Sequence, residues 1–265
     1  MSGFVACCDL DGVLWRGDQP IPGAAEGVEL LRGAGLRVTF LTNNSSGRVA
    51  DYVTRLGAVG VEAAADDIAT SAQAAAALLA ADTAPGARVL ACAGPGVVEA
   101  LEARGFVAVD NGPADAVVVG WHRTFDYERL RRASDAVRAG ARYIATNTDP
   151  TYPTANGSMP GAGSIAAAVS TAGGREPEVA GKPWPPTVAL VRARFGDHGV
   201  MIGDRPSTDG ALADAIGWPF ALVLSGVAGP SGEERVPDPP PPFVAADLGA
   251  LAPELVGSFG ATQAR

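Results

Sequence analysis

Four short apolar segments of this chain each run directly into polar residues of chemically reactive types. The segments are residues 4–8, 38–41, 178–180 and 200–202. Short apolar segments that end at turn signals are typical of buried parallel strands, which are covered on both faces of their sheet. Helical patterns lie between them, as at residues 24–33, so strands and helices alternate along the chain. We therefore predict an α/β fold built on an open parallel sheet.

The polar residues that follow these segments are predicted to share one site. In open α/β sheets, ligands bind beyond the carboxyl ends of the strands, and these residues stand at those ends. They are Asp9 and Asp11 after the first segment, Thr42 and Asn43 after the second, Lys182 after the third, and Asp204 with Asp209 after the fourth.

A second, smaller α/β unit is predicted between the second and the third of these apolar segments. Residues 87–92, 106–109, 116–119 and 142–145 have the pattern of strands, and residues 95–105 and 125–140 that of helices. An alanine-rich helix at 71–80 leads to the boundary. We therefore expect a core domain made of residues 1–82 and 156–265, interrupted by an α/β cap domain at residues 83–155.

The clustered acids predict a metal site. Asp9 and Asp11 stand two residues apart at the end of a buried strand, where desolvation and mutual repulsion oppose their ionisation. Asp204 and Asp209 add further negative charge, and Lys182 is the single lysine of the chain. One ammonium cannot neutralise these acids together with a bound phosphate. Because oxygen ligands favour a hard divalent cation, we expect Mg²⁺.

The chemistry that fits these residues is phosphoryl transfer to a carboxylate. Asp9 is predicted to attack phosphorus and form an aspartyl-phosphate intermediate. Asp11 is predicted to protonate the departing alcohol and then to take a proton from the hydrolytic water. The Thr42 hydroxyl and the amides near Asn43 are expected to bind the phosphoryl oxygens, opposite Lys182 and the metal.

Composition narrows the class of partner. The net charge is −9, and no basic cluster stands out beyond Arg129, Arg131 and Arg132. This balance argues against nucleic acid and anionic membranes as partners, but does not exclude a small anionic substrate, which needs only a local positive site. The phosphoryl chemistry predicted above makes a small phosphorylated metabolite the expected partner. No apolar run reaches the roughly 18 residues of a membrane span, and no signal peptide is expected. The cysteines are interpreted as reduced, which predicts a cytoplasmic protein.

The four corners together resemble the four motifs of the haloacid dehalogenase superfamily. The stretches DLDGVLWRGDQPIPGA, LTNNS, GKP and GDRPSTD, with ATNTDPTYPTANGSMPGAGSI at 145–165, are similar to its NagD/4-nitrophenylphosphatase-like branch. The resemblance covers essentially the whole chain. It implies a Rossmann-like core with an inserted cap, and a magnesium-dependent phosphatase.

The resemblance also implies roles for single residues. Asp9 is the nucleophile, Asp11 the general acid/base, and Lys182 bridges phosphate and nucleophile. The metal is held by Asp9, the Asp11 carbonyl and Asp204, with Asp209 behind them. Candidates for contact with substrate or phosphate are Thr42, Asn43, Gly12, Asn147 and Asp149, and for the last two turn chemistry before Pro150 is equally compatible.

The cap departs from the family pattern at one place. Relatives usually have Gly-x-Asp before a Phe-x-Tyr run, whereas this chain has Gly120-Trp121-His122-Arg123. Trp121 and His122 are either determinants of substrate choice or ordinary surface residues of the cap. Arg48 and Arg205 either meet substrate anions or make ordinary salt bridges. Apolar residues of the cap also allow a homodimer through it.

Other activities remain as alternatives. A dehalogenase of the same fold does not need the second acid, Asp11. A phosphonate hydrolase needs a cap lysine, and residues 85–152 contain none. A catalytically weak relative that binds a phosphorylated ligand or acts as a regulator is the remaining alternative. The physiological substrate is not fixed by the motifs, because the cap loops decide it.

Overall fold

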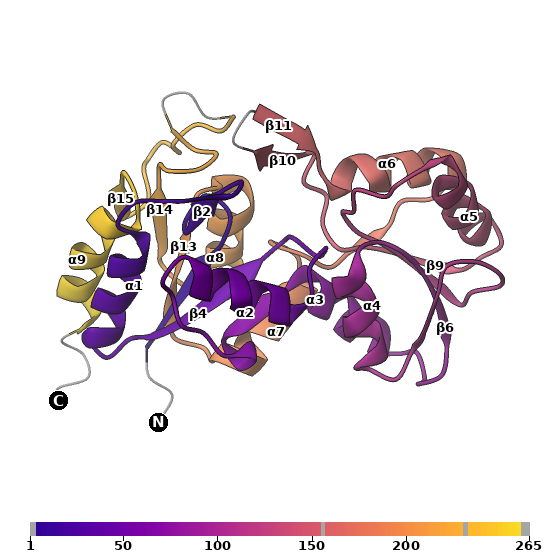
Figure 1. The fold of residues 1–265 in the computed structure, drawn as a ribbon, viewed down its shortest axis with the longest axis horizontal. Coiled ribbons are helices and arrows are strands. Elements are labelled where there is room, and N and C mark those ends of the chain that lie inside the picture. Colours follow the sequence, from indigo (N-terminus) through magenta and orange to yellow (C-terminus); the bar gives the residue numbers. More distant parts are fainter. Residues whose placement is uncertain (1–3, 155–156, 230–232, 261–265) are drawn as a thin grey trace.

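The computed structural model describes residues 4–154, 157–229 and 233–260. These residues form two lobes, each built around its own parallel sheet, which lie side by side along the long axis of the molecule (Figure 1). The α/β class and the inserted second sheet predicted from the sequence are confirmed.

The larger sheet, the core sheet, has six parallel strands in the order β15-β14-β13-β1-β4-β5. Its strands are β1 (Val5–Asp9), β4 (Arg37–Thr42), β5 (Ile68–Thr70), β13 (Gly199–Gly203), β14 (Phe220–Val223) and β15 (Phe243–Ala245). The strand order reverses between β1 and β13, and such switch points open a crevice at the carboxyl ends of the strands.

Helices cover both faces of the core sheet, because alternate side chains of each strand point to opposite faces. Cys8, Phe40 and Ile202 pack on one face, and Cys7, Leu41 and Met201 on the other. The first face is covered by α1 (Ala24–Gly33), α2 (Val49–Ala58) and α9 (Leu248–Phe259). The second is covered by α3 (Ser71–Ala80), α7 (Pro185–Phe195) and α8 (Ala211–Ile216). Helical turns at Ala65–Asp67 and Pro206–Gly210 complete this lobe.

The smaller sheet, the cap sheet, has five parallel strands in the order β12-β9-β8-β6-β7. Its strands are β6 (Arg88–Cys92), β7 (Val107–Val109), β8 (Ala116–Val119), β9 (Arg142–Ala145) and β12 (Glu178–Val179). Helices α5 (Tyr127–Arg138) and α6 (Ala162–Gly173) cover one face, and α4 (Pro95–Glu102) packs on the other.

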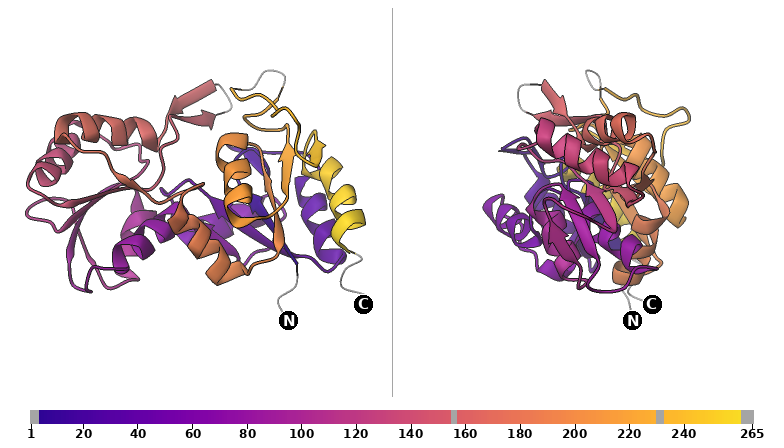
Figure 2. Two further views of the ribbon diagram at one scale, coloured as in Figure 1. Left: turned by 180° about the vertical axis from the view of Figure 1, so that it is seen from behind. Right: turned by 90° about the vertical axis from the view of Figure 1, so that its right-hand side faces the viewer.

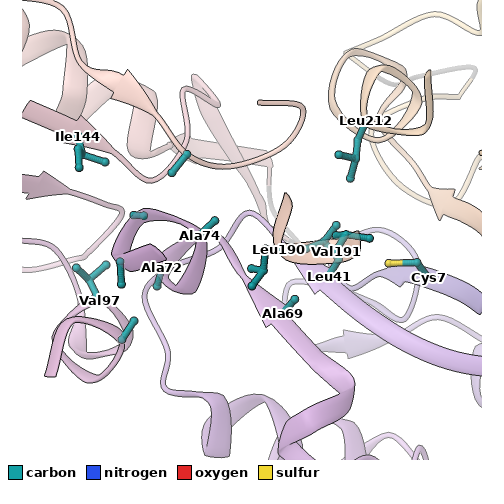
Figure 3. Close-up of a cluster of buried hydrophobic side chains, with 14 of the residues drawn as sticks. Cys7, Leu41, Ala69, Ala72, Ala74, Val97, Ile144, Leu190, Val191 and Leu212 are labelled. Atoms are coloured by element: carbon teal, nitrogen blue, oxygen red, sulfur yellow. The ribbon is translucent and has the colours of Figure 1, made fainter. Parts of the chain in front are cut away.

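One hydrophobic core runs through both lobes. Helix α3 contributes Ala72, Ala74 and Leu79 to a cluster that reaches from Leu41 in the core sheet to Ile144 in the cap sheet (Figure 3). Alanine lets the two sheets approach this helix closely, since its side chain ends at one carbon. The two lobes are thus held together by packing as well as by the chain.

Two antiparallel hairpins lie beyond the sheets. The first, β2 (Trp15–Arg16) and β3 (Gln19–Pro20), follows β1. The second, β10 (Thr151–Thr154) and β11 (Gly157–Pro160), leaves the cap lobe and lies beside the upper loops of the core lobe (Figures 1 and 2).

The third apolar segment differs from its expected place. We expected residues 178–180 to join the same sheet as the other three, but β12 pairs with β9 at the edge of the cap sheet. The reason is that α6, just before it, packs against α5 of the cap. The elements of the cap lobe therefore extend past the expected boundary at residue 155, and the chain returns to the core lobe through Lys182.

Among the described residues, no helix combines the length and the apolar character that crossing a bilayer requires.

Candidate active site

Three buried carboxylates meet at the switch point of the core sheet. Asp9 ends β1, Asp204 follows β13, and Asp209 lies in the helical turn Pro206–Gly210. Single oxygens of the three groups all lie within 4.8 Å of one another. Their exposed fractions are 7%, 2% and 0%, so water screens them little.

The ammonium of Lys182 joins two of these carboxylates. Its Nζ donates to Oδ1 of Asp9 at 2.8 Å and to Oδ1 of Asp209 at 2.6 Å. Burial by itself lowers the pKa of Lys182, but the charges of Asp209 and Asp9 outweigh it and raise that pKa, so the side chain stays protonated. A strand at the edge of the cap sheet thus delivers the cation to the core acids.

Close backbone approach fixes Asp204. Its Oδ2 accepts the amide of Val227 at 2.5 Å, and a Cβ built on Gly226 falls 1.8 Å from the same oxygen. Gly12 has φ +89°, and a Cβ there falls 2.3 Å from that oxygen. Oδ1 of Asp204 accepts no hydrogen bond from the residues that the structure describes. That oxygen is therefore available to a cation.

The donor set fits magnesium. Burial first, and then Asp209, raise the pKa of Asp204 to about 7, and burial also raises the pKa of Asp9 against the opposing charge of Lys182. A further positive charge beside Asp9 and Asp204 would offset these shifts and favour the ionised carboxylates. Their ligand atoms are all oxygens, which suits Mg²⁺. Both oxygens of Asp209 already accept hydrogen bonds from the protein, one from the Lys182 ammonium and one from the Arg205 amide.

Asp11 is held by two donors on a single oxygen. Its Oδ1 accepts Nε1 of Trp15 at 2.9 Å and the hydroxyl of Tyr152 at 2.9 Å. Burial raises the pKa of Asp11, and the bond from Tyr152 opposes that shift. Asp11 lines the cleft, and its raised pKa suits the role of a general acid.

Thr42 and Asn43 line the same cleft, but their side chains differ in how far they are available to hydrogen-bond a ligand. Oγ1 of Thr42 accepts the amide of Asn44 at 3.0 Å, which leaves its hydrogen for a ligand. The Asn43 side chain is already engaged, since its Oδ1 accepts the Lys182 amide at 2.7 Å and its Nδ2 donates to Asp149 at 3.1 Å. Phosphate binding by Asn43 would therefore use its backbone amide.

Family models and relatives agree on the kind of protein. A model described as haloacid dehalogenase-like hydrolase matches residues 6–107, and a second HAD-hydrolase-like model matches residues 179–251. An acid sugar phosphatase of Staphylococcus saprophyticus is 34% identical over 93% of this chain and 96% of its own length. The chain belongs to the haloacid dehalogenase-like hydrolases. Its place within them is the NagD/4-nitrophenylphosphatase branch.

Solved structures of this superfamily superpose closely. The glycerol phosphate phosphatase of Mycobacterium tuberculosis in complex with magnesium has a TM-score of 0.84 and 38% identity, covering 94% of this chain and 76% of that one. The p-nitrophenyl phosphatase of Archaeoglobus fulgidus has a TM-score of 0.85 and 31% identity, covering 96% and 100%.

A longer relative is also similar. The D-glycerol 3-phosphate phosphatase of Mycobacterium tuberculosis is 42% identical over 83% of this chain. The chain spans 62% of the length of that relative.

The cap residues expected near the haloacid dehalogenase-type site do lie on the cleft. Nδ2 of Asn147 donates to the carbonyl of Asn43 at 2.6 Å, and its Oδ1 accepts the amide of Asp149 at 3.0 Å. Burial raises the pKa of Asp149, with Arg205 opposing. Both side chains thus support the loop after β4 and also border the cleft.

The two cap residues that depart from the family pattern, Trp121 and His122, differ in their position relative to the cleft. Trp121 lines the cleft, and its ring stacks on Tyr152 with centroids 4.8 Å apart. His122 is buried away from the cleft, with Nδ1 on the Gly120 carbonyl at 3.0 Å and Nε2 without a partner among the described residues.

Arg48 and Arg205, for which the sequence allowed either a substrate contact or an ordinary salt bridge, also differ in their position relative to the cleft. Arg205 borders the cleft and pairs with Glu234 at 3.6 Å, whereas Arg48 immediately precedes α2 and is not among the residues that line the cleft. Sequence reasoning missed Tyr152, whose hydroxyl reaches Asp11. The only signal for it was its position after Asp149 in the cap motif.

Proposed function

We propose that this chain is a magnesium-dependent phosphatase that hydrolyses small phosphate monoesters through an aspartyl-phosphate on Asp9. The observation that carries the proposal is the ion pair between Lys182 and Asp9, 2.8 Å long, beside the buried carboxylate of Asp204. A lysine held there can meet both the nucleophile and a phosphoryl oxygen. The phosphatases among its relatives support the same chemistry.

The reaction has two displacements at phosphorus. In the first, an oxygen of Asp9 forms a bond to phosphorus while the bond to the ester oxygen breaks, and Asp11 gives its proton to that oxygen. In the second, Asp11 takes a proton from water as the water oxygen bonds to phosphorus and Asp9 leaves. Inorganic phosphate results, Asp9 is again a carboxylate and Asp11 is again protonated, so the proton balance closes.

The hydrogen-bond donors and positive charges around the transferred phosphoryl group stabilise the transition state. Thr42 is positioned to donate its hydroxyl hydrogen to one phosphoryl oxygen, and Lys182 meets another. Mg²⁺, when held by Asp9, Asp204 and the Asp11 carbonyl, supplies the positive charge that lets the anionic nucleophile approach the anionic phosphate. Asp209 holds Lys182 in place.

The lining of the cleft and the phosphatases among the relatives support a proposal for the substrate class. The cleft is lined by the cap residues Trp121, Tyr152 and Asn147 together with the core acids Asp9, Asp11 and Asp204. We propose a small alcohol or sugar phosphate, of the kind named for the glycerol phosphate and acid sugar phosphatases. A cytoplasmic location and a dimer through the cap stay predictions.

The direct test is hydrolysis of 4-nitrophenyl phosphate with magnesium and with EDTA. Wild type should be active only with magnesium, and Asp9→Asn should lose activity. Asp214→Asn, an exposed carboxylate on α8, is the matched control and should stay active. Equal rates in magnesium and EDTA, or an active Asp9→Asn, would refute the proposal. Beryllofluoride should be trapped at Asp9 only if that nucleophile is competent, so absence of both trapping and turnover would favour the phospho-ligand-binding alternative.

A further inference from the structure

The hairpin β10–β11 places a phenol of the cap on an acid of the core. The hydroxyl of Tyr152 donates to Oδ1 of Asp11 at 2.9 Å, across 141 positions of sequence. The ring of Tyr152 is held from behind by Trp121, whose Nε1 donates to the Pro160 carbonyl of the same hairpin at 2.9 Å. The phenol is therefore positioned by contacts that do not depend on its hydroxyl.

The same oxygen of Asp11 has a second donor from the core. Trp15 Nε1 lies 2.9 Å from Oδ1, and the guanidinium of Arg55 lies 4.0 Å above the Trp15 ring. Oδ2 of Asp11 accepts no hydrogen bond from the described part of the chain. Two donors thus reserve Oδ1 as an acceptor, and Oδ2 is the oxygen left to carry a proton.

Further bonds hold the hairpin over the core. Thr151 Oγ1 donates to Glu233 at 2.9 Å, and Ser158 Oγ donates to the other oxygen of the same carboxylate. Both flank Tyr152 on the two strands of the hairpin. The hairpin that carries Tyr152 therefore contacts the core lobe at two carboxylates, those of Asp11 and Glu233.

We propose that Tyr152 is a positioning residue for Asp11 that directs its proton onto Oδ2 and stabilises the carboxylate formed when that proton leaves. This inference rests on the proposed phosphatase function. When the ester bond breaks, the Oδ2 proton passes to the leaving oxygen and Asp11 becomes ionised. Tyr152 keeps its own proton throughout. Its bond to Oδ1 becomes charge-assisted, which strengthens it during the step.

The proposal predicts an effect that depends on the leaving group. An alkoxide is a poor leaving group and needs the proton of Asp11, whereas 4-nitrophenolate is a stable anion that leaves without one. A weakened Asp11 should therefore slow the cleavage of an alkyl phosphate more than that of the aryl phosphate. Because kcat/KM covers the steps through release of the alcohol, it isolates this difference from the later hydrolysis of the aspartyl-phosphate.

The experiment compares Tyr152→Phe with wild type on glycerol 3-phosphate and 4-nitrophenyl phosphate in saturating magnesium. We expect kcat/KM to fall about tenfold or more on glycerol 3-phosphate, the scale of one hydrogen bond to a charged group, and at most about twofold on the aryl ester. Activity on the aryl ester also reports that the variant is folded. Tyr127→Phe, on an exposed ring of α5, is the control and should change neither value.

Equal losses on both esters would overturn the inference, because a loosened hairpin lowers both alike. Unchanged kcat/KM on both would overturn it too, since the hydroxyl would then not act on Asp11. If wild type hydrolyses neither ester, the proposed function itself fails, which is a distinct outcome.

Discussion

The ammonium of Lys182 lies 2.8 Å from Oδ1 of Asp9, although 173 positions of sequence separate the two residues. Asp9 ends a strand of the core sheet, and Lys182 follows a strand of the cap sheet. The nucleophile thus comes from the core lobe, and the cation that compensates it comes from the segment that leads from the cap lobe back to the core lobe. The relative placement of the lobes is therefore part of the site.

Replacement of Lys182 by methionine should lower kcat by about 10²–10³, the scale found for removing one charge-stabilising donor. It should also lower the free energy of unfolding by about 3–5 kcal/mol without metal, because Asp9 and Asp209 lose their buried partner. Steady-state kinetics and urea unfolding measure the two effects. Arg104→Met, at an exposed position, is the control. A variant that keeps wild-type kcat would contradict the role given to Lys182.

Gly12→Ala should weaken magnesium binding. A Cβ there would stand 2.3 Å from Oδ2 of Asp204, at a backbone φ of +89°. Gly86 has φ +88° with nothing within 4 Å of its Cβ position, so Gly86→Ala carries the same backbone strain without touching the site. We expect both variants to lose about 1 kcal/mol of stability or more from that strain. Only Gly12→Ala should need at least about tenfold more magnesium for half-maximal activity, and equal magnesium requirements would refute the steric account.

The strand ends of the core sheet could be predicted from the sequence, because each is marked by a local pattern of residues. Apolar segments next to turn residues predict the strands that end at Asp9, Thr42 and Gly203. The spacing of apolar residues predicts the helix at 24–33, and the alanine-rich composition predicts the helix at 71–80. The roles given to the site residues stay predictions. What the structure adds is that the side chains of Asp9, Asp11, Thr42, Asn43, Lys182 and Asp204 line one cleft.

Other features depend on contacts between segments far apart. The two-residue strand β12 joins the cap sheet because α6 packs there, and no local pattern in residues 178–180 distinguishes the two sheets. The contact of Tyr152 with Asp11 depends on the placement of one lobe against the other. The engagement of the Asn43 side chain by the Lys182 amide is likewise a long-range contact.

Without metal, the protein should lose stability as pH rises toward neutrality. Burial and Asp209 raise the pKa of Asp204 to about 7 in the folded chain, above the unfolded value of about 3.9. The stabilising contribution is then fully present below pH ~4 and is lost as pH rises through about 7. In EDTA the melting temperature should fall between pH 5 and 8, and magnesium should stabilise most at the higher pH.

The control for that profile is a pair of variants. Asp204→Asn should flatten the decline in EDTA and remove most of the magnesium effect, whereas the exposed Asp214→Asn should behave like wild type. Scanning calorimetry at fixed ionic strength measures both. A magnesium effect of equal size in Asp204→Asn would show that the ion binds elsewhere.

Asn43→Ala should loosen the junction between the loop after β4 and Lys182. It removes the acceptor of the Lys182 amide and the donor to Asp149, both buried or partly so. We expect a loss of about 1–3 kcal/mol of stability and a clear fall in kcat, because Lys182 is no longer fixed. Asn111→Ala, at an exposed position of the cap, is the control. If both variants have wild-type kcat, Asn43 does not position the site.

The central claim is that Asp9 carries the phosphoryl group. Acid-quenched enzyme taken during turnover of 4-nitrophenyl phosphate can be reduced with borohydride, which converts an aspartyl-phosphate to homoserine. The modified residue is then located by peptide mass spectrometry. The account predicts homoserine at position 9 only when substrate and magnesium are both present. Rapid turnover with no homoserine at position 9, or with homoserine at another aspartate, would contradict it.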